Sequence, residues 1–218
     1  MISLNKGCKS VLVYTFFLLV VSTPLMATQN EDSLAQEPSK FKFGVHLSGS
    51  MNYFNYGDLQ AFDVASDYTW GGSIGFSFDW KFTNYYHLRF EPYYEYQQLA
   101  NKYKDELNSL DITFTNHNAG FNFFPLVFSV GNKVQPEISV GGYLNYIVST
   151  NYKTSLNGQP VENIEYETNN LQYGLTFGAG LYLGRKLIEV RFKKSLTDYV
   201  VTESQKNSIN QVKFVIVL

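Results

Sequence analysis

The stretch HLRFEPYYEYQQ, His87–Gln98, alternates polar and apolar side chains. One phase is apolar or aromatic and holds Leu88, Phe90, Tyr94 and Tyr96. The other phase is charged and holds His87, Arg89, Glu91 and Glu95. Successive side chains of a β-strand point to opposite faces, so this segment has an apolar face and a charged face. Such a strand fits a half-exposed soluble sheet, a lipid-facing barrel or a fibril-prone edge.

The period of two recurs along the chain, and no segment has a convincing helical period. Eight segments carry it: 41–53, 70–82, 87–98, 110–123, 138–148, 171–183, 188–193 and 212–218. Within 110–123, Ile112 and Phe114 hold one phase whereas Phe121 and Phe123 hold the other, which predicts a bulge near residues 116–118. Pro92 lacks a backbone N–H, so a second bulge is expected there.

Short and long connections alternate between these segments. The short ones are 83–84, 126–133 and 184–186. The long, polar ones are 55–67, 98–108, 150–169 and 198–207. Outer-membrane barrels combine short periplasmic turns with long extracellular loops. The chain is therefore predicted to be all-β: an eight-stranded antiparallel up-and-down transmembrane β-barrel over residues 41–218, with both termini periplasmic.

The composition of the two faces suggests which one meets lipid. The polar phase is rich in Gly, Ser, Thr and Asn, which suits the crowded lumen of an eight-stranded barrel. Three aromatic pairs on the apolar phase are ten residues apart: Phe43 and Tyr53, Trp70 and Trp80, and Tyr86 and Tyr96. Ten residues at a tilt of about 40° climb roughly 25 Å, the usual height between aromatic girdles. These six residues are therefore the predicted girdles.

The N-terminus has the features of a secretory signal. Lys6 and Lys9 precede the apolar run VLVYTFFLLVV at 11–21, and small residues lead to Ala27. This predicts a signal peptide over residues 1–27, with a membrane anchor as the alternative. Residues 28–40 are polar and read as a flexible N-terminus of the mature chain. Cys8 is the only cysteine, so removal of the signal leaves no disulfide and no cysteine metal site.

Three stretches resemble the PorT-like small outer-membrane β-barrel family of Bacteroidota-type bacteria. They are RFEPYYEYQQ (89–98), YGLTFGAGLYL (173–183) and EVRFKKSLTD (189–198). The resemblance spans residues 41–218 and implies an outer-membrane barrel; the family's namesake suggests an interaction subunit of a secretion or envelope assembly. Phe214, Ile216 and Leu218 resemble the C-terminal signal read by the barrel-assembly machinery, an expected partner during biogenesis.

The charged phase predicts a structural salt-bridge network in the lumen, because enclosed charges need partners. Its members are His87, Arg89, Glu91, Glu95, Glu137, Glu189, Arg191 and Lys193, and Asp79 is expected to line the lumen with them. Arg191 and Glu91 are expected to meet across the lumen. A proton path or ligand site is the alternative for these residues.

No catalytic, cofactor-binding or metal residue is predicted. His87 and Glu91 are four strand residues apart, roughly 13 Å, which is too far to share a metal. No serine has an identifiable histidine and acid partner, so the chain is not expected to be an enzyme. With 17 basic and 19 acidic residues, the chain lacks the excess of basic residues that is typical of nucleic-acid-binding proteins.

The expected protein is a monomer in outer-membrane lipid, with a role in envelope integrity, surface contact or limited permeation. Two alternatives stay open: the interaction subunit that the resemblance implies, and a soluble periplasmic ligand-binding barrel whose apolar face points inward.

Overall fold

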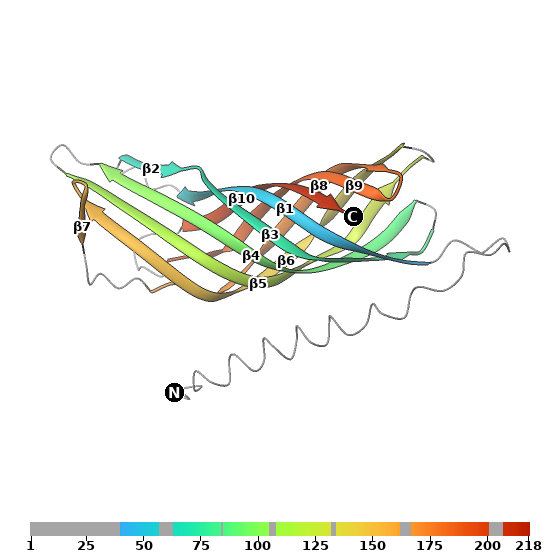
Figure 1. Cartoon of the computed structure of the whole chain (residues 1–218), viewed down its shortest axis with the longest axis horizontal. Coiled ribbons are helices and arrows are strands. Elements are labelled where there is room, and N and C mark those ends of the chain that lie inside the picture. Colours follow the sequence, from blue (N-terminus) through green and yellow to red (C-terminus); the bar gives the residue numbers. More distant parts are fainter. Residues whose placement is uncertain are drawn as a thin grey trace, which may run out of the picture. The chain divides into compact units, whose positions relative to one another are not determined.

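The computed structural model describes residues 40–56, 63–83, 85–104, 108–131, 134–161, 167–200 and 207–218 (Figure 1). The predicted signal peptide and residues 28–39 lie outside this range. Ten strands are present in the described part: β1 (Phe41–Tyr56), β2 (Asp63–Asp67), β3 (Thr69–Lys81), β4 (Tyr86–Lys104), β5 (Ser109–Ser129), β6 (Val134–Leu156), β7 (Gln159–Val161), β8 (Leu171–Leu183), β9 (Lys186–Asp198) and β10 (Asn207–Val217). Among the described residues, no helix has the length and hydropathy needed to cross a membrane.

Eight of these strands close into a ring. The hydrogen-bonded order is β4, β3, β1, β10, β9, β8, β6 and β5, and β5 pairs again with β4. Every pairing is antiparallel. The short strands β2 and β7 pair with the ends of β4 and β6. The predicted eight-stranded barrel is confirmed, and closure leaves its strands without the open edges that promote aggregation.

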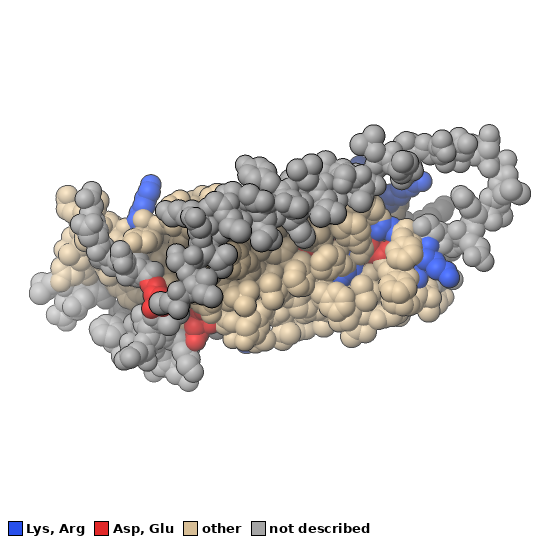
Figure 2. All heavy atoms as spheres, turned by 90° about the horizontal axis from the view of Figure 1, so that it is seen from below, with Lys and Arg blue, Asp and Glu red and all other residues tan. Residues whose placement is uncertain are grey.

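The apolar phase faces outward and the polar phase faces the lumen. In β9, burial alternates residue by residue from Lys186 to Thr197, with Val190 exposed and Arg191 buried. Where grey atoms do not cover it, the middle of the face in Figure 2 is tan, and the blue and red of Lys, Arg, Asp and Glu gather near its two ends. A soluble barrel with an apolar interior is therefore the wrong alternative, because the large apolar side chains are those left exposed.

All six predicted girdle residues point outward. Phe43, Trp70, Trp80 and Tyr96 are exposed, and Tyr53 and Tyr86 are partly exposed. Aromatic contacts gather at two levels. At the end of the barrel where β1 begins and β10 finishes, the ring centroid of Trp80 lies 5.7 Å from that of Phe41 and 4.7 Å from that of Phe82. At the other end of the strands, Tyr53 lies 5.6 Å from Tyr68.

The two ends of the barrel differ. We call the end with the short connections after β3, β5 and β8 the turn end; Phe41 and Leu218 lie there, and the Val45 and Leu218 backbones exchange hydrogen bonds. The opposite end is the loop end. There β4 and β6 run beyond their predicted ends, to Lys104 and Leu156, through much of the segments expected to be long loops, whereas β5 begins at Ser109, next to its predicted start. Two of those loops, 55–67 and 150–169, also contain β2 and β7. Both phases of these extensions carry polar residues, which hides the alternation.

The bulge predicted at Pro92 is wrong. The β3–β4 register is the same at Gly75↔Tyr93 and at Phe78↔Phe90, so no residue is inserted between them. A Cβ at Gly75 would collide with the carbonyl oxygen of Pro92, and glycine therefore lets the two backbones approach without a bulge. The register of β4 against β5 shifts instead between His87 and Arg89.

The bulge predicted near residues 116–118 is not in β5, because the extra residue is Val148 of the facing strand β6. The register of β5 against β6 shifts between His117 and Asn118. Burial along β5 nevertheless keeps alternating through this region, so Ile112 and Phe114 point into the barrel and not to the outside. They belong to an apolar cluster inside the loop end, described below.

Candidate functional site

The eight residues predicted for the lumen network are all buried, at 2% exposure or less. They are His87, Arg89, Glu91, Glu95, Glu137, Glu189, Arg191 and Lys193. Four come from β4, one from β6 and three from β9. They lie in successive layers along the barrel. Asp79 of β3, which was also expected to line the lumen, and Lys213 of β10, which was not predicted, complete these layers.

The layer nearest the turn end is centred on Arg89. Its Nε donates to Asp79 Oδ1 at 2.6 Å, and its two terminal nitrogens donate to the Glu137 carboxylate at 2.7 and 3.0 Å. Nη2 also lies 2.8 Å from the Tyr182 hydroxyl and 3.2 Å from His87 Nε2. The fork of Arg89 thus joins β3, β6 and β8 to β4, and every nitrogen of the guanidinium has a partner.

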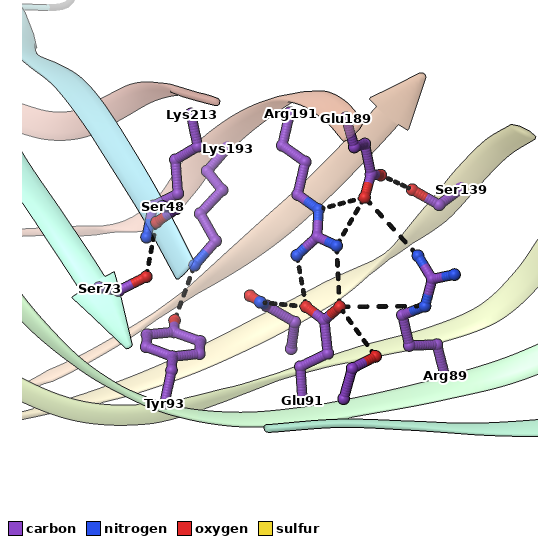
Figure 3. A network of polar contacts seen from close by, with 12 residues as sticks. Ser48, Ser73, Arg89, Glu91, Tyr93, Ser139, Glu189, Arg191, Lys193 and Lys213 are labelled. Atoms are coloured by element: carbon purple, nitrogen blue, oxygen red, sulfur yellow. Dashed lines mark hydrogen bonds and ion pairs between the residues drawn. The ribbon is translucent and has the colours of Figure 1, made fainter. Parts of the chain in front are cut away.

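The next layer is a second arginine fork. Arg191 makes a bidentate ion pair with Glu91 and donates from Nε to Glu189 Oε2 at 2.8 Å (Figure 3). Ser139 donates to the other oxygen of Glu189 at 2.6 Å, and Asn122 donates to Glu91 at 3.1 Å. Charge-assisted bonds of this kind offset the cost of burying the ions.

The two forks form one mesh. Arg89 Nη1 lies 3.6 Å from Glu189, and Arg89 Nε lies 3.9 Å from Glu91. Charges of opposite sign therefore alternate across adjacent layers, as the sticks in Figure 3 show. No carboxylate of the mesh is left without a cation.

A third layer contains lysines and tyrosines. Lys193 Nζ donates to the Tyr93 hydroxyl at 2.7 Å and lies 4.5 Å from the centroid of the Tyr143 ring. Lys213 Nζ lies 2.5 Å from Glu95 Oε1. Sequence reasoning missed Lys213, although its position between the outward residues of β10 at 212 and 214 places it in the lumen phase.

One lumen glycine is required by this packing. A Cβ at Gly178 would collide with Glu189 Oε1 and with the Ser139 hydroxyl. Gly178 is the register partner of Arg191, so the space above it is taken by the Arg191–Glu189 contact. The small residues of the polar phase therefore make room for long charged side chains from neighbouring strands.

Apolar side chains fill the lumen at both ends. At the loop end they form a cluster that we call the inner cap, made of Phe54, Leu99, Ile112, Phe114, Ile147, Tyr199, Val200 and Ile209. Tyr199 is fully buried and donates from its hydroxyl to Asn116 Oδ1 at 2.8 Å. A smaller cluster of Tyr182, Leu187, Val215 and Val217 lies near the turn end. The inner cap was not predicted; the inverted phase of Ile112 and Phe114 was its signal.

The charged side chains of the lumen are paired with one another across strands. Within the described ranges, no group of three His, Cys, Asp or Glu side chains is placed to hold a metal ion. His46 contacts the Tyr93 ring edge-on, with 6.1 Å between centroids, and His87 contacts Arg89 and two carboxylates. His117 faces outward, where its Nδ1 lies 2.6 Å from the Tyr94 hydroxyl. The three histidines thus occupy unrelated environments.

Comparison with known proteins gives a family and a set of similar folds. A family model described as "Outer membrane protein beta-barrel domain" matches residues 29–200. Similar solved structures include Ail, the attachment invasion locus protein of Yersinia pestis, at 13% identity and a TM-score of 0.36, covering 82% of this chain and 98% of that chain. Neisserial surface protein A has 13% identity and a TM-score of 0.40, with 83% and 99% covered. OprG from Pseudomonas aeruginosa has 11% identity and a TM-score of 0.39, with 80% and 93% covered. No curated protein sequence matches the chain.

Proposed function

Because this chain belongs to the outer membrane β-barrel domain family and is a small barrel of the Gram-negative outer membrane, we propose that it acts through its surface and not as a channel. In this proposal the barrel is a rigid membrane anchor. It presents the strand extensions of the loop end to partners outside the cell.

The observation that carries the proposal is the unequal length of the strands. β8 and β9 have 13 residues each, whereas β4, β5 and β6 have 19, 21 and 23. The three long strands are neighbours, and β2 and β7 pair with their loop-end halves. One side of the barrel wall therefore continues past the other as a sheet, seen at the left of Figure 1. A barrel that served only to span the membrane would not need this extension.

The packed lumen supports a structural role over permeation. Arg89, Arg191 and Lys193 cross the interior to partners on other strands, and the inner cap lies between this network and the loop end. Eight strands enclose little more space than their own side chains occupy. General diffusion through the barrel is therefore not part of the proposed function.

We also propose that the barrel is not an enzyme. Each buried histidine is engaged by aromatic or charged neighbours rather than by a serine hydroxyl in the described part of the chain. Two lumen serines donate their hydroxyls to carboxylates: Ser139 to Glu189 and Ser77 to Glu91.

The second candidate is an interaction subunit of a secretion or envelope assembly, which the PorT-like resemblance of residues 89–98 and 173–198 favours. Its partner would be a periplasmic or membrane protein that contacts the turn end. This differs from the first proposal in the end of the barrel that is used.

Site-specific crosslinking in intact cells separates the two. A photo-reactive residue replaces Lys153, exposed on the loop-end extension, or Arg185, exposed in the β8–β9 turn. Surface interaction predicts adducts from position 153, formed with macromolecules outside the cell, and none from position 185. Discrete adducts from position 185 alone would contradict the surface role and favour the assembly subunit.

A further inference from the structure

Three lysines lie on the lumen phase of the barrel wall at the mouth of the turn end. Lys42 of β1 has Asp79 as its register partner on β3, and Lys81 lies two residues beyond Asp79 on the same phase. Lys40 joins them, because its carbonyl oxygen accepts a hydrogen bond of 2.8 Å from the Lys81 backbone. Lys40 and Lys42 are exposed and Lys81 is partly exposed. The lumen phase therefore ends, at this mouth, in cations that water can reach.

Lys42 and Lys81 adjoin each other although both are positively charged. The ammonium of Lys42 lies over the ring of Tyr182, 5.2 Å from its centroid, and is repelled by the ammonium of Lys81 beside it. Among the described residues, no ion pair joins either lysine to a carboxylate. Like charges at close range cost free energy unless an anion lies between them. The pair thus offers two cations to one anion.

The buried acids nearest to the pair already have other partners. Arg89 donates to Asp79 Oδ1 and to both oxygens of Glu137, and the Tyr182 hydroxyl donates to Asp79 Oδ2 at 3.2 Å. Lys42 is attracted by both carboxylates, yet every oxygen of the two accepts a hydrogen bond from another residue. Neutralising these acids therefore does not explain why two lysines lie side by side.

Aromatic side chains separate the pair from lipid headgroups. Phe41 and Trp80 are exposed on the outward face, next in sequence to Lys42 and Lys81, and their ring centroids are 5.7 Å apart. Phe82 adds a third exposed ring, 4.7 Å from Trp80. Because successive side chains point to opposite faces of a strand, the lysines face away from these rings. A ligand therefore reaches the lysines along the barrel axis, from the periplasm.

The rim around the mouth is positive as well. Arg185 and Lys186 are exposed at the β8–β9 turn, and blue Lys and Arg side chains gather at the right-hand end of Figure 2, which is the turn end. The acidic side chains of the described residues near this end are Asp79, Glu137 and Glu189, which are at most 6% exposed. A mouth lined by one sign of charge concentrates counter-ions from the solution.

We propose that this mouth binds the phosphate group of a soluble periplasmic molecule. One phosphate oxygen accepts a hydrogen bond from Lys42 and a second from Lys81, while Lys40 approaches from the rim. A phosphate monoester carries about −1.5 to −2 charges at neutral pH, which suits two adjoining cations better than a single carboxylate does. The ligand is held and not transported, since Tyr182 and the arginine forks close the lumen behind it. The inference is independent of the surface role, because it concerns the opposite end of the barrel.

The test is isothermal titration calorimetry of the purified barrel with inorganic phosphate near neutral pH, and with acetate at the same ionic strength. Each titration is carried out in dodecyl maltoside micelles and in phosphatidylcholine nanodiscs, which surround the barrel with lipid phosphates. The variants are Lys42→Gln and Lys81→Gln. Lys186→Gln is the matched control, since Lys186 is exposed at the same end but on the outward phase. The faster gel migration of unheated barrel verifies the fold of each variant, and urea titration with and without phosphate gives its stability.

The proposal predicts one phosphate per barrel, bound about tenfold more tightly than acetate and equally well in micelles and nanodiscs. Lys42→Gln and Lys81→Gln each weaken binding about tenfold, whereas Lys186→Gln keeps it within about twofold. Phosphate raises the urea midpoint of the parent and leaves that of Lys42→Gln unchanged.

Four results would overturn the proposal. Equal affinity for acetate would mean diffuse attraction to a positive surface, and equal loss in Lys186→Gln would assign the effect to net charge. Binding in micelles that disappears in nanodiscs would make the ligand a lipid phosphate and not a soluble one. A Lys42→Gln barrel that is less stable than the parent without phosphate would mean that Lys42 neutralises Asp79 and Glu137 instead.

Discussion

Arg191 and Glu91 meet as a bidentate ion pair although 100 residues separate them in the sequence. Their strands, β9 and β4, are four places apart in the ring of eight in either direction, so the pair spans the lumen from one wall to the opposite one. Both side chains are at most 1% exposed. This contact ties the two halves of the barrel together through its interior.

Gly178→Ala is expected to destabilise the barrel. The added Cβ would occupy the space of the Glu189 carboxylate, which Arg191 and Ser139 hold in place. Overpacking of this kind costs about 1–3 kcal/mol. The free energy of unfolding is read from urea titrations of detergent-refolded protein.

Gly49→Ala is the matched control for this glycine. Gly49 faces outward, and no atom lies within 4 Å of the position that its Cβ would take. Its effect is expected to stay within about 0.5 kcal/mol. Equal losses in the two variants would mean that the lumen around Gly178 is not packed as described.

Val190→Arg tests the outward face of β9. Val190 is exposed between Ile188 and Phe192 on the same face. A charge near the bilayer midplane costs roughly 2–4 kcal/mol in outer-membrane barrels. The same urea titration, carried out in phospholipid vesicles, should show this loss, and a Val190→Leu control should show almost none. If arginine were as well tolerated as leucine, this face would lie in water.

The barrel is expected to give no porin-like conductance. The network from Arg89 to Lys213 and the inner cap fill the lumen with side chains. Planar-bilayer recordings of purified protein should show a silent membrane or only brief, small events. Long-lived openings of the size typical of general porins would prove that the lumen is open.

Protease added to intact cells should distinguish the two ends of the barrel. Lys153 lies on the loop-end extension of β6, and Arg185 lies in the β8–β9 turn. Short turns of bacterial outer-membrane barrels are periplasmic. Trypsin is therefore expected to cut at Lys153 and to spare Arg185 until the outer membrane is permeabilised. Cleavage at Arg185 in intact cells would invert the orientation.

The sequence predicts this fold best where strands alternate strictly. β8 and β9 read directly as apolar-out and polar-in, since each buried lumen residue is followed by an exposed one. The Arg191–Glu91 contact was also predictable, because both residues lie in the lumen phase at a similar distance from a turn. Arg89 was predictable as a lumen residue, but its contacts with Asp79, Glu137 and Tyr182 on three other strands were not.

The loop end was the least predictable part, for physical reasons. Above the membrane both faces of a strand can meet water, so the polar extensions of β4 and β6 lose the period that marks a spanning strand. Inside the barrel, the inner cap reverses the rule that apolar residues point outward. Ile112 and Phe114 therefore look like lipid-facing residues until their neighbours Leu99 and Tyr199 are known.

The double-mutant cycle of Arg191 and Glu91 tests the central claim, a polar lumen enclosed by a lipid-facing wall, most directly. The measurement is the free energy of unfolding of Arg191→Leu, Glu91→Gln and the double variant, from urea titration of refolded protein. Arg191→Leu should cost about 3–5 kcal/mol, because it leaves the buried carboxylates of Glu91 and Glu189 short of a cation. Adding Glu91→Gln should recover part of that loss and not all, since Glu189 stays underpaired. An Arg191→Leu barrel as stable as the parent, with no coupling to Glu91, would place Arg191 in water and contradict the account.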